Sequence, residues 1–311
     1  MSFLEAVEPS RESEVTLVAR DARSLNVLTV DVEEWFQVSN FSPCIRRDDW
    51  DNYPTRTQDI LPRLLNILAE YDARATFFTL GWVAKRFPEL IRRIVDEGHE
   101  LASHGDEHEL VTNQTPEEFR RQLERSVDTL QQAAGCRVYG HRAPSYSFRK
   151  ETEWAVHILI EAGFLYDSSI FPFGGRRVPE ICEERFPCYL HNGYDQSLTE
   201  YPLSTVRFLG TNWPIAGGGY FRLLPYEFLK WGMQELNRSS RRVITYFHPW
   251  EIDPDQPRVK NASWLSRFRH YYDLEGTESK LRRLLCDFRF GSIRDVFWSE
   301  KTARYEITPQ Q

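Results

Sequence analysis

The chain has 311 residues, of which 41% are hydrophobic and 14% are aromatic, so it can bury a large core and is not an intrinsically disordered protein. The formal net charge of -7 argues against a surface that binds polyanions, and nucleic acid is not an expected partner. No uncharged apolar run reaches the ~18 residues that cross a bilayer, and the first thirty residues show no signal peptide, so we expect a cytoplasmic protein.

Apolar residues fill both faces of residues 25–30, which predicts a strand buried on both sides, as in a parallel sheet. From there, helices and strands are predicted to alternate. The helices are expected over residues 57–71, 83–97, 116–134 and 151–162. The strands between them are expected over residues 75–80, 99–103, 138–142 and 164–166. This alternation predicts an α/β fold whose site residues gather at the carboxyl ends of the strands.

Two helix ends carry clear local signals. Gly98 is typical of a helix C-terminal cap, at the end of the helix expected over 83–97. Thr115, Pro116 and Glu118 combine an N-cap, a proline in the first turn and a capping-box glutamate. These signals fix the start of the longest predicted helix.

The helical rhythm stops after residue 170. Residues 171–220 are rich in proline, glycine and aromatic residues, which predicts irregular loops with a strand pair at 198–203 and 205–209. A helix over 225–237, a strand over 242–247 and a helix over 278–288 follow. We expect one domain, with an N-terminal extension (1–24), a catalytic unit with irregular insertions (25–255) and a C-terminal extension packed on it (256–311).

Five cysteines form an odd set without CxxC spacing, which argues against a thiolate zinc site. Buried free thiols are the expected state. A bridge between Cys182 and Cys188 is the alternative, which a cytoplasmic chain would not normally keep. The cysteines are Cys44, Cys136, Cys182, Cys188 and Cys286.

Acidic residues and histidines of the metal-binding type follow two predicted strands. His104 and His108 are four residues apart, so a helical turn or tight loop could bring both imidazoles to one ion. Asp31 and Glu33 follow the first strand and point to the same side, because side chains alternate along a strand. One could bind a metal while the other acts as a base. Glu34 is expected to be solvated.

Three further residues lie at strand ends and are candidates for catalysis. His248 follows the strand at 242–247 and could protonate a leaving group, with a packed core histidine as the alternative. Arg142 and Asp167 could orient the base and the acid respectively, although each alone would be an ordinary salt-bridge residue.

In chain order, these segments resemble the motifs of the polysaccharide deacetylases, carbohydrate esterase family four, over about residues 25–255. The segments are Thr29-Val30-Asp31, Ser103-His104 with His108, Arg142-Ala143-Pro144, Asp167-Ser168-Ser169 and Phe247-His248-Pro249. The sequence from Tyr246 to Pro254 is similar to a branch found with bacterial exopolysaccharide gene clusters. The resemblance implies a distorted, incomplete (β/α) barrel of about seven parallel strands. It also implies N-deacetylation of acetylated amino sugars in a polysaccharide or its precursor, with zinc or a similar divalent ion.

Carried over by position, the resemblance makes Asp31 the general base, His104 and His108 metal ligands, and His248 the general acid. Arg142 orients the base and Asp167 tunes the acid.

The first motif departs from the common form of the family. Most members have two adjacent aspartates, of which the second binds the metal, whereas Val32 stands there in this chain. A branch of the family has an Asp-x-Asp arrangement, which Asp31-Val32-Glu33 resembles. Glu33 is accordingly the expected third ligand.

Aromatic side chains are expected to line a substrate groove, because their faces stack on sugar rings. The candidates are Tyr146, Phe171, Trp213 and Trp250. Two other functions fit the same residues. A metal-dependent amidohydrolase could cleave a small non-sugar amide, and a non-catalytic sugar-binding protein could retain a decayed metal site.

Overall fold

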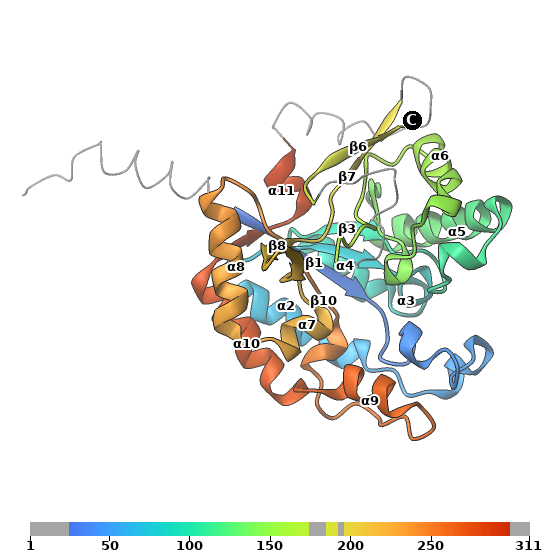
Figure 1. Ribbon diagram of the computed structural model, residues 1–311. Coiled ribbons are helices and arrows are strands. Elements are labelled where there is room, and N and C mark those ends of the chain that lie inside the picture. Colours follow the sequence, from blue (N-terminus) through green and yellow to red (C-terminus); the bar gives the residue numbers. More distant parts are fainter. Residues whose placement is uncertain (1–24, 174–184, 192–195, 299–311) are drawn as a thin grey trace, which may run out of the picture.

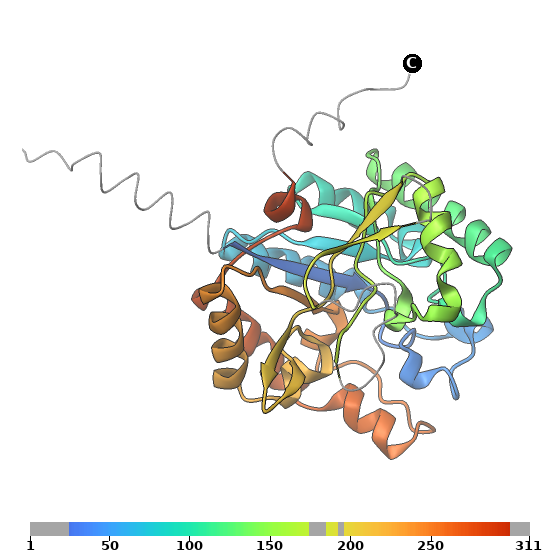
Figure 2. The same cartoon turned by 45° about the horizontal axis from the view of Figure 1, so that its top comes forward.

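The computed structural model describes residues 25–173, 185–191 and 196–298. A largely parallel sheet runs through the molecule and helices surround it (Figures 1 and 2). The strands follow the order β10-β1-β2-β3-β4-β5-β7-β6. They are β10 (Ile244–Phe247), β1 (Leu25–Val32), β2 (Thr76–Thr79), β3 (Glu100–Ser103), β4 (Gly140–His141), β5 (Tyr166–Asp167), β7 (Ser197–Glu200) and β6 (Cys188–His191).

Seven strands of this path, from β10 to β7, are parallel, and β6 is antiparallel at the edge. The predicted α/β class with about seven parallel strands is therefore confirmed. Within the described residues the ladder does not close, because an irregular segment follows β7. Its backbone N–H groups at Tyr201 and Ser204 donate to the carbonyls of Asp167 and Ile244, 2.8 Å and 3.2 Å away. This segment spans the gap of an incomplete barrel.

The helices have the following bounds. They are α2 (Thr57–Glu70), α3 (Gly81–Arg86), α4 (Pro88–Asp96), α5 (Pro116–Ala134), α6 (Trp154–Glu161), α7 (Gly218–Leu223), α8 (Tyr226–Arg238), α9 (Trp264–Tyr271), α10 (Leu274–Asp287) and α11 (Ile293–Phe297). The single helix expected over 83–97 is wrong, since α3 and α4 are separate. Pro88 has no N–H to donate and disfavours helical geometry at Phe87, so the chain breaks there.

The predicted start of α5 is confirmed. The Thr115 hydroxyl accepts from the N–H of Glu118 at 3.2 Å, and the Glu118 carboxylate accepts from the N–H of Thr115 at 2.8 Å. Gly135 ends the helix with φ of 69°, a left-handed conformation that costs glycine little. Gly98, the other expected cap residue, follows α4 with φ of 84°.

Strands form at both positions expected, 198–203 and 205–209, but the expectation that they pair with each other is wrong. Strand β7 lies between β5 and β6, whereas β8 (Thr205–Phe208) pairs antiparallel with β9 (Thr211–Pro214). The turn between β8 and β9 holds only Leu209 and Gly210, with φ of 49° and 78°. Positive φ at both positions is the geometry of a tight two-residue hairpin turn.

The cysteines also depart from expectation. Cys188 is disulfide-bonded, so the free-thiol prediction is wrong for this residue, and Cys182 lies outside the described residues. Cys44, Cys136 and Cys286 are not in disulfides and are not fully buried, and Cys286 is exposed.

The last described segment joins the sheet and the helical layer. Strand β11 (Arg289–Gly291) pairs parallel with the first residues of β1, and α10 packs against α7 and against the short helix η6 (Pro249–Ile252) that follows β10. The expected N-terminal extension, 1–24, lies outside the described residues. Among the helices described, none is long and apolar enough to cross a membrane.

Candidate active site

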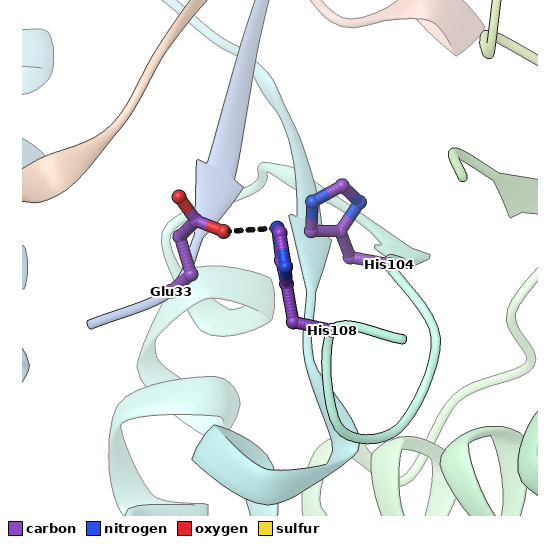
Figure 3. A group of neighbouring side chains, drawn as sticks. All are labelled: Glu33, His104 and His108. Atoms are coloured by element: carbon purple, nitrogen blue, oxygen red, sulfur yellow. Dashed lines mark ion pairs between the residues drawn. The ribbon is translucent and has the colours of Figure 1, made fainter. Parts of the chain in front are cut away.

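Three potential metal ligands meet at the carboxyl ends of β1 and β3 (Figure 3). Glu33 follows β1, and His104 and His108 lie in the loop after β3. One donor atom from each lies within 4.8 Å of the others, and all three side chains are buried. The structure thus brings together the three ligands expected from the sequence.

Backbone geometry in the loop after β3 turns both imidazoles toward Glu33. His104 directly follows β3, and its backbone N–H donates to the carbonyl of Thr79 at 3.0 Å. Gly105 and His108 then take φ of 81° and 51°. A left-handed conformation is uncommon for histidine, and such strain is concentrated at functional sites. The sequence allowed either a helical turn or a tight loop to bring His104 and His108 together, and the structure has the tight loop.

The three side chains fit a divalent cation. Nδ1 of His104 lies 2.8 Å from the carbonyl oxygen of Arg142, which can only accept, so Nδ1 carries the proton and Nε2 keeps its lone pair. Oε2 of Glu33 is buried and accepts no well-directed hydrogen bond, although Nε2 of His108 lies 2.7 Å away. Two imidazoles and one carboxylate form a donor set that zinc commonly takes at hydrolytic sites.

The electrostatics agree with this donor set. Burial alone raises the pKa of Glu33, but the nearby His108 and the charge of His248 outweigh burial and lower it to about 2. Burial lowers the pKa of His104 to about 4. At neutral pH, Glu33 is therefore ionised and His104 is neutral, which are the protonation states that bind metals.

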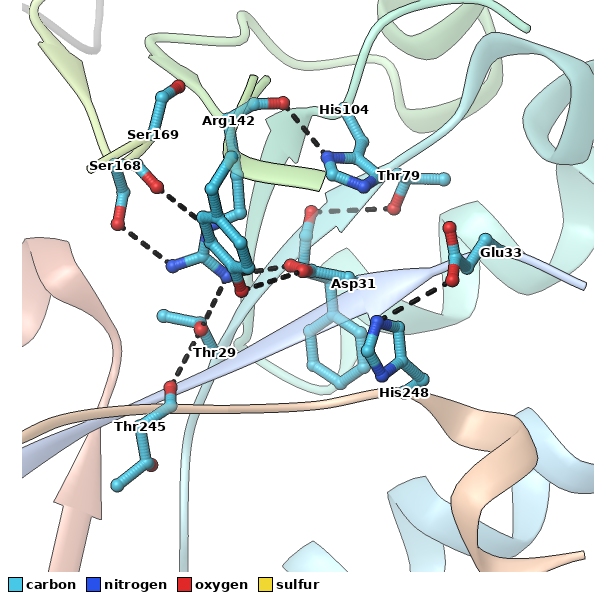
Figure 4. A network of polar contacts seen from close by, with 12 residues as sticks. Thr29, Asp31, Glu33, Thr79, His104, Arg142, Ser168, Ser169, Thr245 and His248 are labelled. Atoms are coloured by element: carbon cyan, nitrogen blue, oxygen red, sulfur yellow. Dashed lines mark hydrogen bonds and ion pairs between the residues drawn. The ribbon is translucent and has the colours of Figure 1, made fainter. Parts of the chain in front are cut away.

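Asp31 is held by the buried guanidinium of Arg142 (Figure 4). Nη1 of Arg142 donates to Oδ1 of Asp31 at 2.6 Å and to the hydroxyl of Thr29 at 2.7 Å. Its Nε and Nη2 donate to the carbonyl and hydroxyl of Ser168 at 2.9 Å and 2.8 Å. The Tyr146 hydroxyl lies 3.4 Å from Oδ2 of Asp31. Arg142 and Asp31 therefore form the pair expected from the sequence.

His248 lies beside Glu33, with its Nε2 3.5 Å from Oε1 of Glu33 (Figure 4). Its Nδ1 is 2.8 Å from Oε1 of Glu251, which also accepts the His248 N–H at 3.0 Å. Burial lowers the pKa of His248, but the hydrogen bond to Glu251 and nearby carboxylate charges raise it to about 8. Sequence reasoning missed Glu251, although its place three residues after His248 is the spacing of a capping box.

Asp167 does not contact His248, so the expectation that it tunes the acid is not met by the structure. Its Oδ1 lies 2.7 Å from Nδ1 of His141, and its Oδ2 accepts from the N–H of Ser169 at 2.9 Å. All three residues are buried. The order of motifs along the sequence could not show whether Asp167 or Glu251 contacts His248. Asp167 ends β5 and Glu251 follows β10, and both strands belong to the parallel sheet.

Glu34 is not solvated, contrary to expectation, but only 1% exposed. Its carboxylate accepts from the N–H of Arg56 at 2.9 Å and from the N–H of Thr57 at 3.0 Å. These groups lie at the start of α2, where free N–H groups and the helix dipole favour an anion. Glu34 therefore anchors α2 to the end of β1.

A cavity of about 510 Å³ opens over these residues. Asp31, the three potential ligands and His248 line it, as do the expected aromatic residues Tyr146, Phe171 and Trp250. Trp213 is not among the lining residues and this expectation is wrong. Trp213 lies in β9 and packs edge-on against Phe208 and Phe228, with ring centroids 6.1 Å and 5.8 Å away.

Two family descriptions match the chain in succession. Residues 48–163 match the polysaccharide deacetylase family, and residues 168–298 match a domain of unknown function. A peptidoglycan deacetylase of Helicobacter pylori is 34% identical over 110 residues, which are 35% of this chain and 36% of that protein. A chitooligosaccharide deacetylase of Sinorhizobium fredii is 51% identical over 47 residues, 15% of this chain and 22% of that protein. The matches thus span about a third or less of these curated relatives.

Two solved structures share the fold. A Mycobacterium smegmatis protein, provisionally named a polysaccharide deacetylase, aligns with a TM-score of 0.60 at 22% identity, over 93% of this chain and 94% of that one. A similarly named protein of Pseudomonas aeruginosa aligns with a TM-score of 0.56 at 15% identity, over 86% and 85% of the two chains.

Proposed function

The chain belongs to the polysaccharide deacetylase family, and on this premise we propose that it removes N-acetyl groups from amino sugars of a polysaccharide or its precursor. One observation carries the proposal. Asp31, which Arg142 holds, the cluster of Glu33, His104 and His108, and His248, which Glu251 holds, line a single cavity. Hydrolysis of an amide needs a base, an electrophile and an acid, and these groups have the chemistry of all three.

Glu33, His104 and His108 would hold a divalent cation, for which we propose zinc. Such an ion supplies Lewis-acid polarisation of the acetyl carbonyl and lowers the pKa of water in the site. The donor set supports a catalytic site, because three protein ligands leave a coordination position open.

Asp31 serves as the general base. Arg142 fixes Oδ1, which leaves Oδ2 to accept a proton from the attacking water. Burial of the pair holds the base in one orientation before the substrate arrives.

His248 serves as the general acid. An ionised carboxylate can only accept hydrogen bonds, so Glu251 keeps one proton on Nδ1 of His248. The second proton of the imidazolium, on Nε2, faces the cavity. It passes to the amide nitrogen of the substrate as the C–N bond breaks. Acetate and a free amino sugar are the products.

Acetate release from N-acetylglucosamine oligomers and peptidoglycan fragments tests the proposal. We expect release by the wild type to increase with added zinc and to fall at least about a hundredfold in Asp31→Asn and His248→Ala. Asp48→Asn and His191→Ala are matched controls, because both residues are exposed and outside the cavity. Equal release by all five proteins would contradict the assigned roles.

A further inference from the structure

The outer face of α9 carries a row of exposed aromatic side chains that the mechanism above does not use. Trp264, Phe268 and Tyr272 are spaced by four residues and therefore share one face of the helix and its end. Their exposed fractions are 75%, 38% and 41%. Large aromatic side chains exposed in a contiguous group mark binding surfaces.

The three rings form a continuous row of contacts, stacked between Trp264 and Phe268 and tilted between Phe268 and Tyr272, here called the α9 aromatic ladder. The rings of Trp264 and Phe268 are 5.6 Å apart at 15°, and those of Phe268 and Tyr272 are 5.1 Å apart at 50°. Eight residues of helix correspond to about 12 Å along the axis, which is longer than one sugar ring. The ladder therefore has room for more than one ring.

The ladder is continuous with the candidate active site. Phe268 and Tyr272 line the catalytic cavity together with Leu265, and Trp264 stacks on Phe268 one turn farther out. Helix α9 lies on the side of the molecule toward which the arrow of β1 points (Figures 1 and 2). A chain of sugar rings that leaves the cavity on this side meets the ladder next.

A buried arginine fixes the ladder relative to His248. The guanidinium of Arg222 donates to Oε2 of Glu251 at 2.8 Å. It also donates to the carbonyls of Arg269 at 3.0 Å and Tyr272 at 2.9 Å, at the end of α9. The residue that holds the general acid is thereby tied to the helix that carries the ladder. This connection preorganises the two parts of the site.

We propose that the α9 aromatic ladder binds sugar rings beyond the one that is deacetylated, so that the substrate is a glycan of several rings. The proposal rests on the function proposed above and specifies its substrate class. It also gives a role in glycan binding to part of residues 168–298, the region that matches a domain of unknown function.

The surroundings of the ladder favour a glycan over a lipid surface. The wall of the same cavity carries Ser39, Asn40 and Arg269, whose hydrogen-bonding groups suit sugar hydroxyls. Aromatic faces combined with a few polar groups are typical of sites that bind small amphipathic rings. A lipid tail would leave these polar groups without partners.

Length dependence tests the ladder. The test compares kcat/KM for N-acetylglucosamine oligomers of two and six rings in the wild type, Trp264→Ala, Trp264→Tyr and Tyr189→Ala. The ratio of hexamer to dimer should fall about three- to tenfold in Trp264→Ala, the scale of one aromatic contact. Trp264→Tyr should restore most of the ratio. Tyr189→Ala is the control, since Tyr189 is 66% exposed and lies outside the cavity.

Calorimetric binding of the hexamer to Asp31→Asn, with and without Trp264→Ala, separates the two proposals. If no protein releases acetate but Trp264→Ala still weakens hexamer binding, the ladder stands and the proposed function fails. If acetate is released and Trp264→Ala leaves both the length ratio and the hexamer affinity unchanged, the ladder proposal is wrong. Loss of binding to phosphatidylglycerol vesicles in Trp264→Ala, with an unchanged length ratio, would show a membrane surface and also overturn it.

Discussion

Two buried carboxylates, Asp167 and Glu251, each lie beside a histidine ring, but only Glu251 serves a histidine that faces the cavity. Arg222 adds a charge-assisted hydrogen bond on the other side of Glu251. The carboxylate therefore stays ionised and can orient His248 through both its backbone N–H and Nδ1. Glu251 is a positioning residue for the proposed acid.

Glu251→Gln should lower kcat for N-acetylglucosamine oligomers at least about tenfold and change KM less, because the acid acts in the transition state. The same variant should lose much less activity on 4-nitrophenyl acetate, whose leaving group needs no proton. Glu227→Gln, at an exposed position on α8, is the control. Equal losses on the amide and the ester would argue for a purely structural role.

At the scale of elements, a histidine joins the start of β2 to the turn before β3. Nδ1 of His99 accepts the backbone N–H of Ala75 at 3.2 Å, and only a neutral ring can accept there. Burial lowers the pKa of His99 from 6.5 to about 4. The unfolded chain therefore binds a proton below pH 6.5 that the native protein does not bind until about pH 4. His99 makes stability decrease as the pH falls through this range.

Between pH 7 and pH 5, this linkage should cost the wild type about 2 kcal/mol in the free energy of unfolding. His99→Asn keeps an acceptor for Ala75 and removes the titrating group, so its loss over the same range should be smaller by about that amount. Urea unfolding at the two pH values measures both. An identical pH dependence in the two proteins would contradict the assignment.

At the scale of the whole molecule, the potential metal ligands join segments that are far apart in sequence. Glu33 belongs to the end of β1, whereas His104 and His108 belong to the loop after β3. An ion held by both would stabilise the native state, because the unfolded chain has no preformed site.

We expect zinc at a hundredfold excess over its Kd to stabilise the wild type by about 2.7 kcal/mol, which raises Tm by several degrees. His104→Ala should lose most of this shift, and His191→Ala, at an exposed position on β6, should keep it. Differential scanning calorimetry and elemental analysis provide the measurement. A shift of the same size in His104→Ala would place the ion elsewhere.

Local pattern alone predicted much of the molecule. The alternation of apolar segments predicted the parallel sheet, and Thr115 and Glu118 predicted the start of α5, because periodicity and capping act within a few residues. The candidate ligands could also be named, since strand ends of a parallel sheet meet at one edge. Pro88 was a local signal too, and its break between α3 and α4 follows from the chemistry of proline.

Tertiary structure decided what each polar or aromatic side chain contacts. Glu34 became a buried anchor for α2 because the start of that helix packs over the end of β1. Trp213 turned away from the cavity because the β8–β9 hairpin packs on α8. Asp167 does not reach His248 because β5 pairs with β4, which places its carboxylate beside His141. These outcomes depend on contacts between distant segments, and a pattern along one chain segment contains no information on which segment will pack against it.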